Sequence, residues 1–461
     1  MEQKTAVWQE VSDTELRLCD YPTSIEEKIK RYDLATAIRV VRGVESTAAR
    51  GAVFAEIKDK NPLYRLVDNL YSKAGARVGQ PFLLYLYMLT CVLSLGPFDD
   101  DNAEAIGIAN FSNEHNTIDR LAAILAGTRI LRLSLKWRHM FSLGQLRAAV
   151  RVAGTAPRVW SFLARLARSH SFMPAARVAS CLAYYARFSQ VFADRPGLNA
   201  GIVASNYSPE AVGLAAAAHG MCRRVIYVNH APVPANAPSV PPVLADCAVF
   251  YGDAMRQTYE RRSHCTADVA LIGQPGAIRP MTWSDDVRTV GIFLTALTRT
   301  DAVAALVAAI RATCPGVRVL IRNHPVALVK SDFSELAARY GNLDITQGNR
   351  LDDEIAACDL IFCGNSGVAL NALRGGRPVA YCAELDGLRF DYNGFVESGL
   401  VCDVPVWSED LYARLKGFYT SSAWQPVMQS YDASYGADAA ELERAAARTI
   451  RRYLSPTPGR G

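Results

Sequence analysis

One histidine and one serine in the C-terminal half of the chain follow short apolar runs in a pattern that suits phosphate binding. Residues 317–322 and 359–363 are largely apolar and bounded by turn residues, which predicts two buried parallel strands. His324-Pro325 follows the first run, and Gly364-Asn365-Ser366-Gly367 follows the second. Because ligands of open α/β sheets bind at the carboxyl ends of strands, we expect both groups at one edge. A helix beginning at Ser366 would direct free N–H groups at an anion.

A third predicted strand, residues 289–294, ends in hydroxyl and guanidinium groups. Together with the imidazole and the helix start, these groups suit a diphosphate or a nucleotide monophosphate. His324 could instead be a turn histidine, and Ser366 an ordinary helix cap. The predicted nucleotide-binding residues are His324, Pro325, Asn365, Ser366, Gly367, Thr295, Thr298 and Arg299.

The N-terminal half offers candidates for a general base. Glu114 and His115 lie in a predicted loop between a strand at residues 105–110 and a helix at residues 118–126. A transferase needs a base for the acceptor hydroxyl, and histidine serves with little tuning of its pKa. His115 is therefore the first catalytic candidate and Glu114 the second, although either could simply cap the helix. Three further side chains are possible substrate contacts, namely His230, Asn206 and Asp391.

The sequence predicts neither a metal nor a cofactor. Metal-dependent transfer usually needs an Asp-x-Asp-like pair at a strand end, and the acidic runs at residues 99–101 and 352–354 suit a solvated turn and a helix start instead. The 11 cysteines form no C-x-x-C pair and no zinc spacing, which predicts reduced thiols in a cytoplasmic protein.

The 461 residues alternate strand-like and helix-like segments over most of residues 105–400. This alternation predicts an α/β fold with two Rossmann-like doubly wound domains facing a cleft. We expect an N-terminal helical region at residues 1–103, a first Rossmann-like acceptor domain at 104–275 and a nucleotide-sugar-binding domain at 276–437. A C-terminal helix and tail at 438–461 would follow. Within the first domain, residues 129–195 are expected to form a basic helical insert.

Residues 129–187 contain many arginines, one lysine and no acidic residue. Such a segment suits an anionic membrane surface or an anionic substrate, while solvated arginines on a packed helical insert are the alternative. The segment matches no nucleic-acid module. The uncharged run at residues 80–98 is at the short limit for a membrane span, and its prolines and tyrosines favour a buried or interfacial helix. We expect a cytoplasmic protein, peripheral on the inner membrane.

The motifs R-N-H-P, D-L-I-F-C-G-N-S-G-V-A-L-N-A-L and G-R-P-V-A-Y resemble bacterial glycosyltransferases of the GT-B type with an HP motif. That group comprises sialyl- and polysialyltransferases, capsule Kdo transferases and teichoic-acid-type glycerophosphotransferases. The resemblance covers roughly residues 200–400 and implies that His324 and Ser366 contact the phosphate of a CMP- or CDP-linked donor. This chain departs from the group at Asn365-Ser366, where many members have two hydroxyl residues. It also lacks an evident acidic motif ending in glycine, which carries the base in sialyltransferases.

Residues and resemblance together predict a metal-independent glycosyltransferase. Its donor would be a nucleotide-activated sugar, CMP-linked sialic acid or Kdo, and its acceptor a bacterial cell-surface polysaccharide or glycolipid. The alternatives are a CDP-polyol phosphotransferase of the same fold, a non-catalytic nucleotide-binding protein, and a nucleotide-sugar epimerase. The epimerase would need no acceptor.

Overall fold

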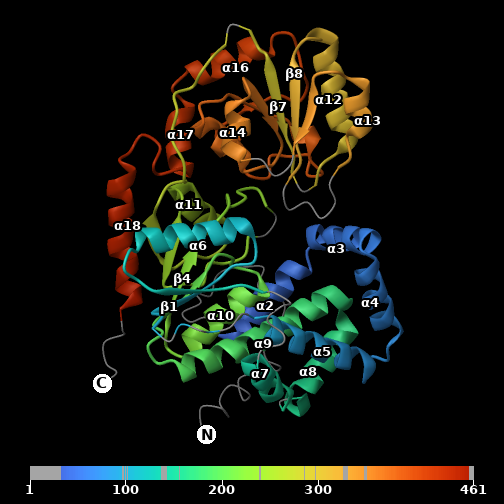
Figure 1. Ribbon diagram of the computed structural model, residues 1–461, viewed down its shortest axis with the longest axis vertical. Helices are drawn as coiled ribbons and strands as arrows, with labels where there is room; N and C mark the ends of the chain where they lie inside the picture. Colours follow the sequence, from blue (N-terminus) through green and yellow to red (C-terminus); the bar gives the residue numbers. More distant parts are fainter. Residues whose placement is uncertain are drawn as a thin grey trace.

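The structure is a computed structural model that describes residues 33–95, 98, 100, 102–135, 143–154, 156–237, 240–284, 286–295, 297–324, 331–346 and 350–455. Pro325, one of the predicted nucleotide-binding residues, lies outside these residues. The described chain forms two α/β domains, each built on a six-stranded parallel sheet, with a group of helices beside the first domain (Figure 1).

The first sheet has the strand order β2-β1-β3-β4-β5-β6. Its central strands are completely buried, as expected of apolar runs covered on both faces. The strand order changes direction between β1 and β3, which makes this the switch point of a doubly wound sheet. The strands are β1 (Ala105–Ile108), β2 (Ile130–Leu133), β3 (Ala200–Val203), β4 (Arg224–Val228), β5 (Cys247–Phe250) and β6 (Asp268–Leu271).

The second sheet has the strand order β12-β11-β10-β7-β8-β9. Counted within this domain, that is the order 6-5-4-1-2-3 of a Rossmann fold, with its switch point between β7 and β10. The two sheets together confirm the predicted pair of doubly wound domains, which is the GT-B arrangement. The strands are β7 (Thr289–Phe293), β8 (Arg318–Arg322), β9 (Leu343–Thr346), β10 (Leu360–Cys363), β11 (Val379–Tyr381) and β12 (Cys402–Asp403).

Helices flank both sheets and form the region beside the first domain. In the first half of the chain they are α2 (Leu34–Glu45), α3 (Ala48–Lys60), α4 (Pro62–Lys73), α5 (Gly79–Ser94), α6 (Ser112–Ile124), α7 (Leu143–Ala153), α8 (Ala156–Ser169), α9 (Phe172–Asp194), α10 (Pro209–Gly220) and α11 (Asp253–Arg262). In the second half they are α12 (Thr300–Thr313), α13 (Ser334–Arg339), α14 (Leu351–Ala356), α15 (Val368–Arg374), α16 (Leu411–Thr420), α17 (Trp424–Tyr431) and α18 (Ala439–Leu454).

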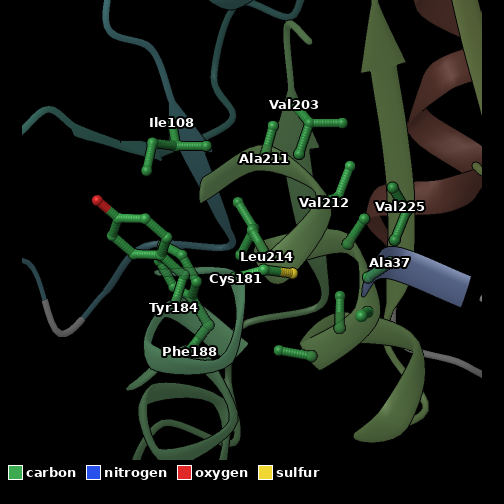
Figure 2. Packing of buried hydrophobic residues seen from close by; sticks show 14 of the residues in the cluster. Ala37, Ile108, Cys181, Tyr184, Phe188, Val203, Ala211, Val212, Leu214 and Val225 are labelled. Atoms are coloured by element: carbon green, nitrogen blue, oxygen red, sulfur yellow. The ribbon is translucent and has the colours of Figure 1, made fainter. Parts of the chain in front are cut away.

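Helix α9 is the buried crossover helix between β2 and β3. Figure 2 shows its side chains Cys181, Tyr184 and Phe188 beside Leu214 of α10, and all four are almost completely buried. Gly213 permits this close approach, because a Cβ there would lie 2.9 Å from the Tyr184 Cβ. The predicted basic insert is therefore not helical throughout. Its start, Ile130–Leu133, forms the edge strand β2, and α9 is part of the domain core.

Residues 80–94 of the apolar run lie in α5, which is partly buried and partly exposed. Leu84, Met88 and Val92 are completely buried, whereas Phe82 and Leu86 on another face are 49% and 41% exposed. No helix in the described part of the chain is both long and apolar enough to cross a membrane.

The end of the chain returns from the second domain to the first. Helix α17 packs near α11, and α18 lies along β6 of the first sheet (Figure 1). An ion pair of 3.0 Å between Arg120 and Glu443 fastens α18 to α6. The predicted terminal helix at residues 438–453 thus packs on the first domain, so the two domains are connected by two crossings of the chain.

A buried ion pair joins these two crossings. Arg374, at the end of α15, donates hydrogen bonds to the Asp432 carboxylate and to the Gly276 carbonyl oxygen. The Asp432 carboxylate also accepts a 2.8 Å hydrogen bond from the backbone N–H of Gln274. Arg374 is 4% exposed and Asp432 is 0% exposed, so water does not compensate either charge.

Candidate functional site

The two domains enclose a cavity of about 310 Å³ at the carboxyl ends of their strands. This volume is at the lower end of the range for ligand sites. The first domain contributes residues that follow β4, β5 and β6. The second domain contributes residues at or after the ends of β7, β8 and β10, and the first residue of α14. The lining residues are His230, Ala231, Pro232, Tyr251, Gln274, Pro275, Phe293, Leu294, Arg322, Asn323, His324, Leu351, Ser366, Gly367, Val368 and Asn371.

His324 and Ser366 line this same cavity, from adjacent parts of the second domain. His324 comes two residues after β8 and Ser366 three residues after β10, on either side of the central strand β7. Burial lowers the pKa of His324, and the nearby Arg322 guanidinium lowers it further. The imidazole is therefore neutral at pH 7, and each of its nitrogens can act only as a donor or only as an acceptor.

Arg322 brings a guanidinium to the cavity wall next to His324. It forms an ion pair with Glu354 of α14, and both side chains are largely buried. A carboxylate partner holds the guanidinium in place and reduces the net charge that it presents to a ligand. Arg322 can thus position a donor group at the cavity without making the apo site strongly positive.

Ser366 begins the turn into α15. Its hydroxyl oxygen accepts a 3.3 Å hydrogen bond from the N–H of Val368, the first residue of α15, and Ser366 is also a residue of the cavity wall. Gly367 follows it and lies against Pro232 of the other domain. A Cβ at this position would be only 3.1 Å from the Pro232 Cδ. A glycine here lets the proline-rich loop of the first domain approach the predicted phosphate site.

His230 faces these residues from the first domain. Its Nδ1 is hydrogen-bonded to the carbonyl oxygen of Ala204, after β3. A carbonyl oxygen only accepts, so Nδ1 carries the proton and the neutral ring keeps the acceptor lone pair on Nε2. This tautomer has the basic nitrogen that proton abstraction requires.

The proline-rich loop after His230 is fastened to the second domain. The Asn236 N–H donates to the Tyr392 carbonyl at 3.0 Å, and the Asn236 side chain donates to the Asp391 carbonyl at 2.8 Å and to Glu397 at 2.9 Å. These bonds hold the two domains together beside the cavity. They also explain how the loop brings Ala231 and Pro232 into the cavity wall.

Asp391, predicted as a possible substrate contact, stabilises a turn with its carboxylate. The two carboxylate oxygens accept hydrogen bonds of 2.9, 2.8 and 2.9 Å from the N–H groups of residues 395–397. The side chain is not part of the cavity lining. Asn206 is also directed elsewhere, since its amide donates to the Pro241 carbonyl at 2.7 Å and the residue lines a separate cavity of about 10 Å³.

The predicted hydroxyl and arginine loop after β7 does not reach the cavity wall. Arg299 forms ion pairs with Glu384 at 2.7 Å and Asp301 at 2.6 Å, and the Thr298 hydroxyl donates to the Thr295 carbonyl at 2.8 Å. The cation of Arg299 is therefore compensated by two acids. Of the residues after this strand, the cavity lining instead includes Leu294.

Asn365 is held in the structure by its side chain. Its amide nitrogen donates to the Leu388 and Phe390 carbonyls at 2.9 and 3.0 Å, and its amide oxygen accepts from the Tyr381 hydroxyl at 2.9 Å and the Tyr392 N–H at 2.8 Å. This uses both donors and both lone pairs of the amide. Asn365 fixes the turn that positions Ser366 and is not itself part of the cavity lining.

Glu114 and His115 lie in the first turn of α6 and not in a loop, which corrects the predicted position. The Glu114 carboxylate accepts hydrogen bonds of 2.8 and 3.3 Å from the N–H groups of Asn110 and Phe111, so it caps the helix. Neither Glu114 nor His115 lines the cavity. A catalytic role for either stays a prediction.

Sequence reasoning missed several residues of the cavity. Arg322 was counted only as the last strand residue, although it stands two positions before the predicted histidine. Asn371 lies on α15 one helical turn after Gly367, and this spacing could have indicated it. Tyr251 and Gln274 come from the other domain, and the two domains meet only after folding. Among the described residues, no cluster of three or more His, Cys, Asp or Glu side chains is arranged to hold a metal ion.

The sequence matches no family model and no curated protein. Solved structures with a similar arrangement include UDP-GlcNAc 2-epimerase from Neisseria meningitidis bound to UDP-GlcNAc, with 11% identity and a TM-score of 0.47 over 76% of this chain and 99% of that one. The glycosyltransferase SnogD from Streptomyces nogalater has 15% identity and a TM-score of 0.47 over the same shares. The UDP complex of MnaA from S. aureus has 11% identity and a TM-score of 0.45 over 77% and 99%. The fold assignment rests on the strand order of the two sheets.

Proposed function

We propose that this chain is a glycosyltransferase that moves a sugar from a nucleotide-activated donor, CMP-linked sialic acid or Kdo, to a bacterial cell-surface polysaccharide or glycolipid. The observation that carries the proposal is the shared cavity. Two groups that suit a donor phosphate, His324 and Ser366, line one wall, and a histidine with a basic Nε2 lines the opposite wall. The CMP-linked donor is supported by the motif resemblance around these two residues.

In this reaction the acceptor hydroxyl oxygen forms a bond to the anomeric carbon, and the bond from that carbon to the phosphate oxygen breaks. The electron pair leaves with the nucleotide, and the proton of the acceptor passes to a base. His324 and Ser366 would donate hydrogen bonds to the phosphate oxygens on which negative charge develops. Arg322, held by Glu354, would add a positive charge beside them.

For the base we propose His230 in place of His115 or Glu114. Its support is its position in the cavity wall opposite His324 and the hydrogen bond that leaves Nε2 as the acceptor nitrogen. The Glu114 carboxylate, by contrast, is engaged by two backbone N–H groups of its own helix start. No step of the proposed mechanism calls on a metal ion or a further cofactor.

The direct test is a thermal-shift screen of CMP, CDP, UDP and GDP with the wild type and with His324→Ala. A ligand that binds only the folded state stabilises it by about 2.7 kcal/mol at 100 times its Kd. We expect CMP to raise the Tm of the wild type most. Loss of a hydrogen bond to a charged phosphate costs about 1.5–3 kcal/mol. His324→Ala should therefore lower the affinity for CMP roughly 10- to 100-fold.

Arg299→Gln is the matched control, because Arg299 belongs to the predicted nucleotide loop but is paired with acids away from the cavity. Arg299→Gln should bind CMP with the affinity of the wild type. Unchanged CMP binding by His324→Ala would refute the site. Product analysis with donor and acceptor then separates the alternatives: phosphorus in the product indicates a polyol phosphotransferase, and conversion of the donor without acceptor indicates an epimerase.

We also propose that the enzyme binds the inner-membrane surface through its helical region. Apolar residues on α4 and α5 are exposed, with Leu63, Leu66 and Leu70 at 69%, 55% and 53%. The three leucines are spaced three and four positions apart and therefore share one face of α4. Lys73 lies in the last turn of α4, three positions after Leu70, and an apolar face with a basic neighbour is typical of helices that lie on anionic lipid.

This surface predicts that a smaller fraction of the Leu66→Ser/Leu70→Ser variant than of the wild type binds to anionic liposomes. Burying one such leucine in the bilayer boundary contributes about 1.5–3 kcal/mol, so the double variant should bind at least roughly tenfold more weakly. Sedimentation with phosphatidylglycerol vesicles measures the bound fraction. Val406→Ser, at an equally exposed apolar residue of the second domain, is the control. Equal recovery of all three proteins would contradict membrane binding by α4.

A further inference from the structure

A second cavity, of about 230 Å³, lies among α2, α8 and α9, away from the site between the domains. In Figure 1 these helices lie in the part of the molecule opposite the second domain. The lining residues are Arg42, Phe162, Arg165, Leu166, Ser169, His170 and Val178. The polar side chains among these described lining residues are two arginines, one serine and one histidine, and none is a carboxylate.

The cavity combines a cationic rim with an apolar floor. Arg42 is half-buried and Arg165 is exposed, whereas Phe162, Leu166 and Val178 are 1%, 6% and 1% exposed. Two guanidiniums that flank one cavity are suited to bind phosphate, because each presents a planar pair of N–H donors. The apolar floor would accommodate the hydrocarbon next to that phosphate and adds a favourable burial term.

The positive charge of Arg42 affects the protonation of His170, another residue of the cavity lining. Burial lowers the pKa of His170, and the charge of Arg42 lowers it further. The Nδ1 of His170 is hydrogen-bonded to the Ser169 hydroxyl at 2.6 Å. Arg42 also lies in the last turn of α2 and balances the partial negative charge of that helix end as well. That second role needs no ligand, and the experiment separates the two.

We propose that this cavity binds a phosphate group carried on an alkyl or isoprenyl chain, with Arg42 and Arg165 on the phosphate and Phe162, Leu166 and Val178 on the first carbons of the chain. Such a phosphate is the chemistry of a lipid-linked molecule, while a soluble phosphate is the other source of the same group. The binding site is independent of the nucleotide cavity and of the glycosyltransferase proposal.

The test measures the binding of decyl phosphate, below its micellar concentration, to the full chain by intrinsic tryptophan fluorescence. Inorganic phosphate and decanol are the parallel probes. We expect decyl phosphate to bind at least about tenfold more tightly than either, because only it uses both rim and floor. Arg42→Gln/Arg165→Gln should weaken it by about tenfold or more. Arg42→Lys/Arg165→Lys keeps the charge but loses the planar pairs of donors, so it should bind decyl phosphate more tightly than the glutamine variant and more weakly than the wild type.

Arg168→Gln is the matched control, because Arg168 is an exposed arginine of the same helix that does not line the cavity. It should bind decyl phosphate like the wild type. Added CMP should not compete. Equal binding of inorganic phosphate and decyl phosphate, both lost in the double variant, would support the phosphate site with a soluble ligand. Undiminished binding by Arg42→Gln/Arg165→Gln, or decanol binding as tightly as decyl phosphate, would overturn the proposal.

Discussion

Replacing His230 with asparagine is expected to lower turnover by about 10²–10⁴-fold, the usual contribution of a general base. Asparagine places an amide N–H near the position of Nδ1, so the hydrogen bond to the Ala204 carbonyl can persist. The basic lone pair of Nε2 is lost. Affinity for CMP should stay within about threefold of the wild type, since the predicted phosphate contacts come from the other domain. Steady-state turnover and the CMP thermal shift measure the two quantities.

Three further substitutions make this prediction specific. His115→Asn and Glu114→Gln test the earlier candidates, and both should keep turnover within about tenfold of the wild type if His230 is the base. His230→Ala removes the anchor together with the base. If His230→Asn is fully active while His230→Ala is not, His230 only holds the proline-rich loop. A loss of turnover confined to His115→Asn would return the role of base to α6.

Replacing Arg374 with leucine should lower the free energy of unfolding by about 3–5 kcal/mol, because it leaves a buried carboxylate without its cation. Asp432 is 0% exposed, and no water can take the place of the guanidinium. The Gly276 carbonyl and the Ser434 hydroxyl, at 2.9 Å from the guanidinium, lose their donor as well. Urea unfolding at pH 7, followed by far-UV circular dichroism, measures the change.

Arg318→Leu is the control on a different ion pair of the same domain. Arg318 pairs with Asp344 at 2.6 Å, but the two side chains are 50% and 47% exposed, so the loss should be within about 0–1 kcal/mol. Adding Asp432→Asn to Arg374→Leu removes the unpaired charge and should recover part of the stability. Equal losses in Arg374→Leu and Arg318→Leu would show that burial of the pair does not matter.

The fold could be predicted from the sequence because its strands are locally encoded. The runs at residues 317–322 and 359–363 are apolar and bounded by turn residues, and both form strands. Parallel strands bring their carboxyl ends to one edge, so the meeting of His324 and Ser366 at one cavity also followed from local pattern. Edge strand β2 was missed because only one of its four residues is buried and Arg132 interrupts its apolar pattern.

The remaining site predictions depended on partners that are distant in the sequence. The sequence predicts Arg299 as a phosphate ligand, but in the structure its guanidinium pairs with Glu384, which is 85 residues away in the sequence. Asn365 likewise bonds to residues 388 and 390. The start of α6 lies earlier than predicted because its N-cap is Phe111, which no capping rule favours. Glu114 instead accepts hydrogen bonds from the backbone N–H groups of Asn110 and Phe111. Such contacts are set by tertiary packing, which local sequence does not encode.

The Arg374–Asp432 pair ties both chain crossings at one point, since Gln274 and Gly276 belong to the first and Asp432 to the second. Because both connections between the two domains meet at this ion pair, we expect the domains to open by a hinge motion about it. The hydrogen bond from Asn236 to the Asp391 carbonyl also joins the two domains but does not belong to this ion pair. Entry of a donor should therefore break the bonds of the proline-rich loop first and leave the pivot intact.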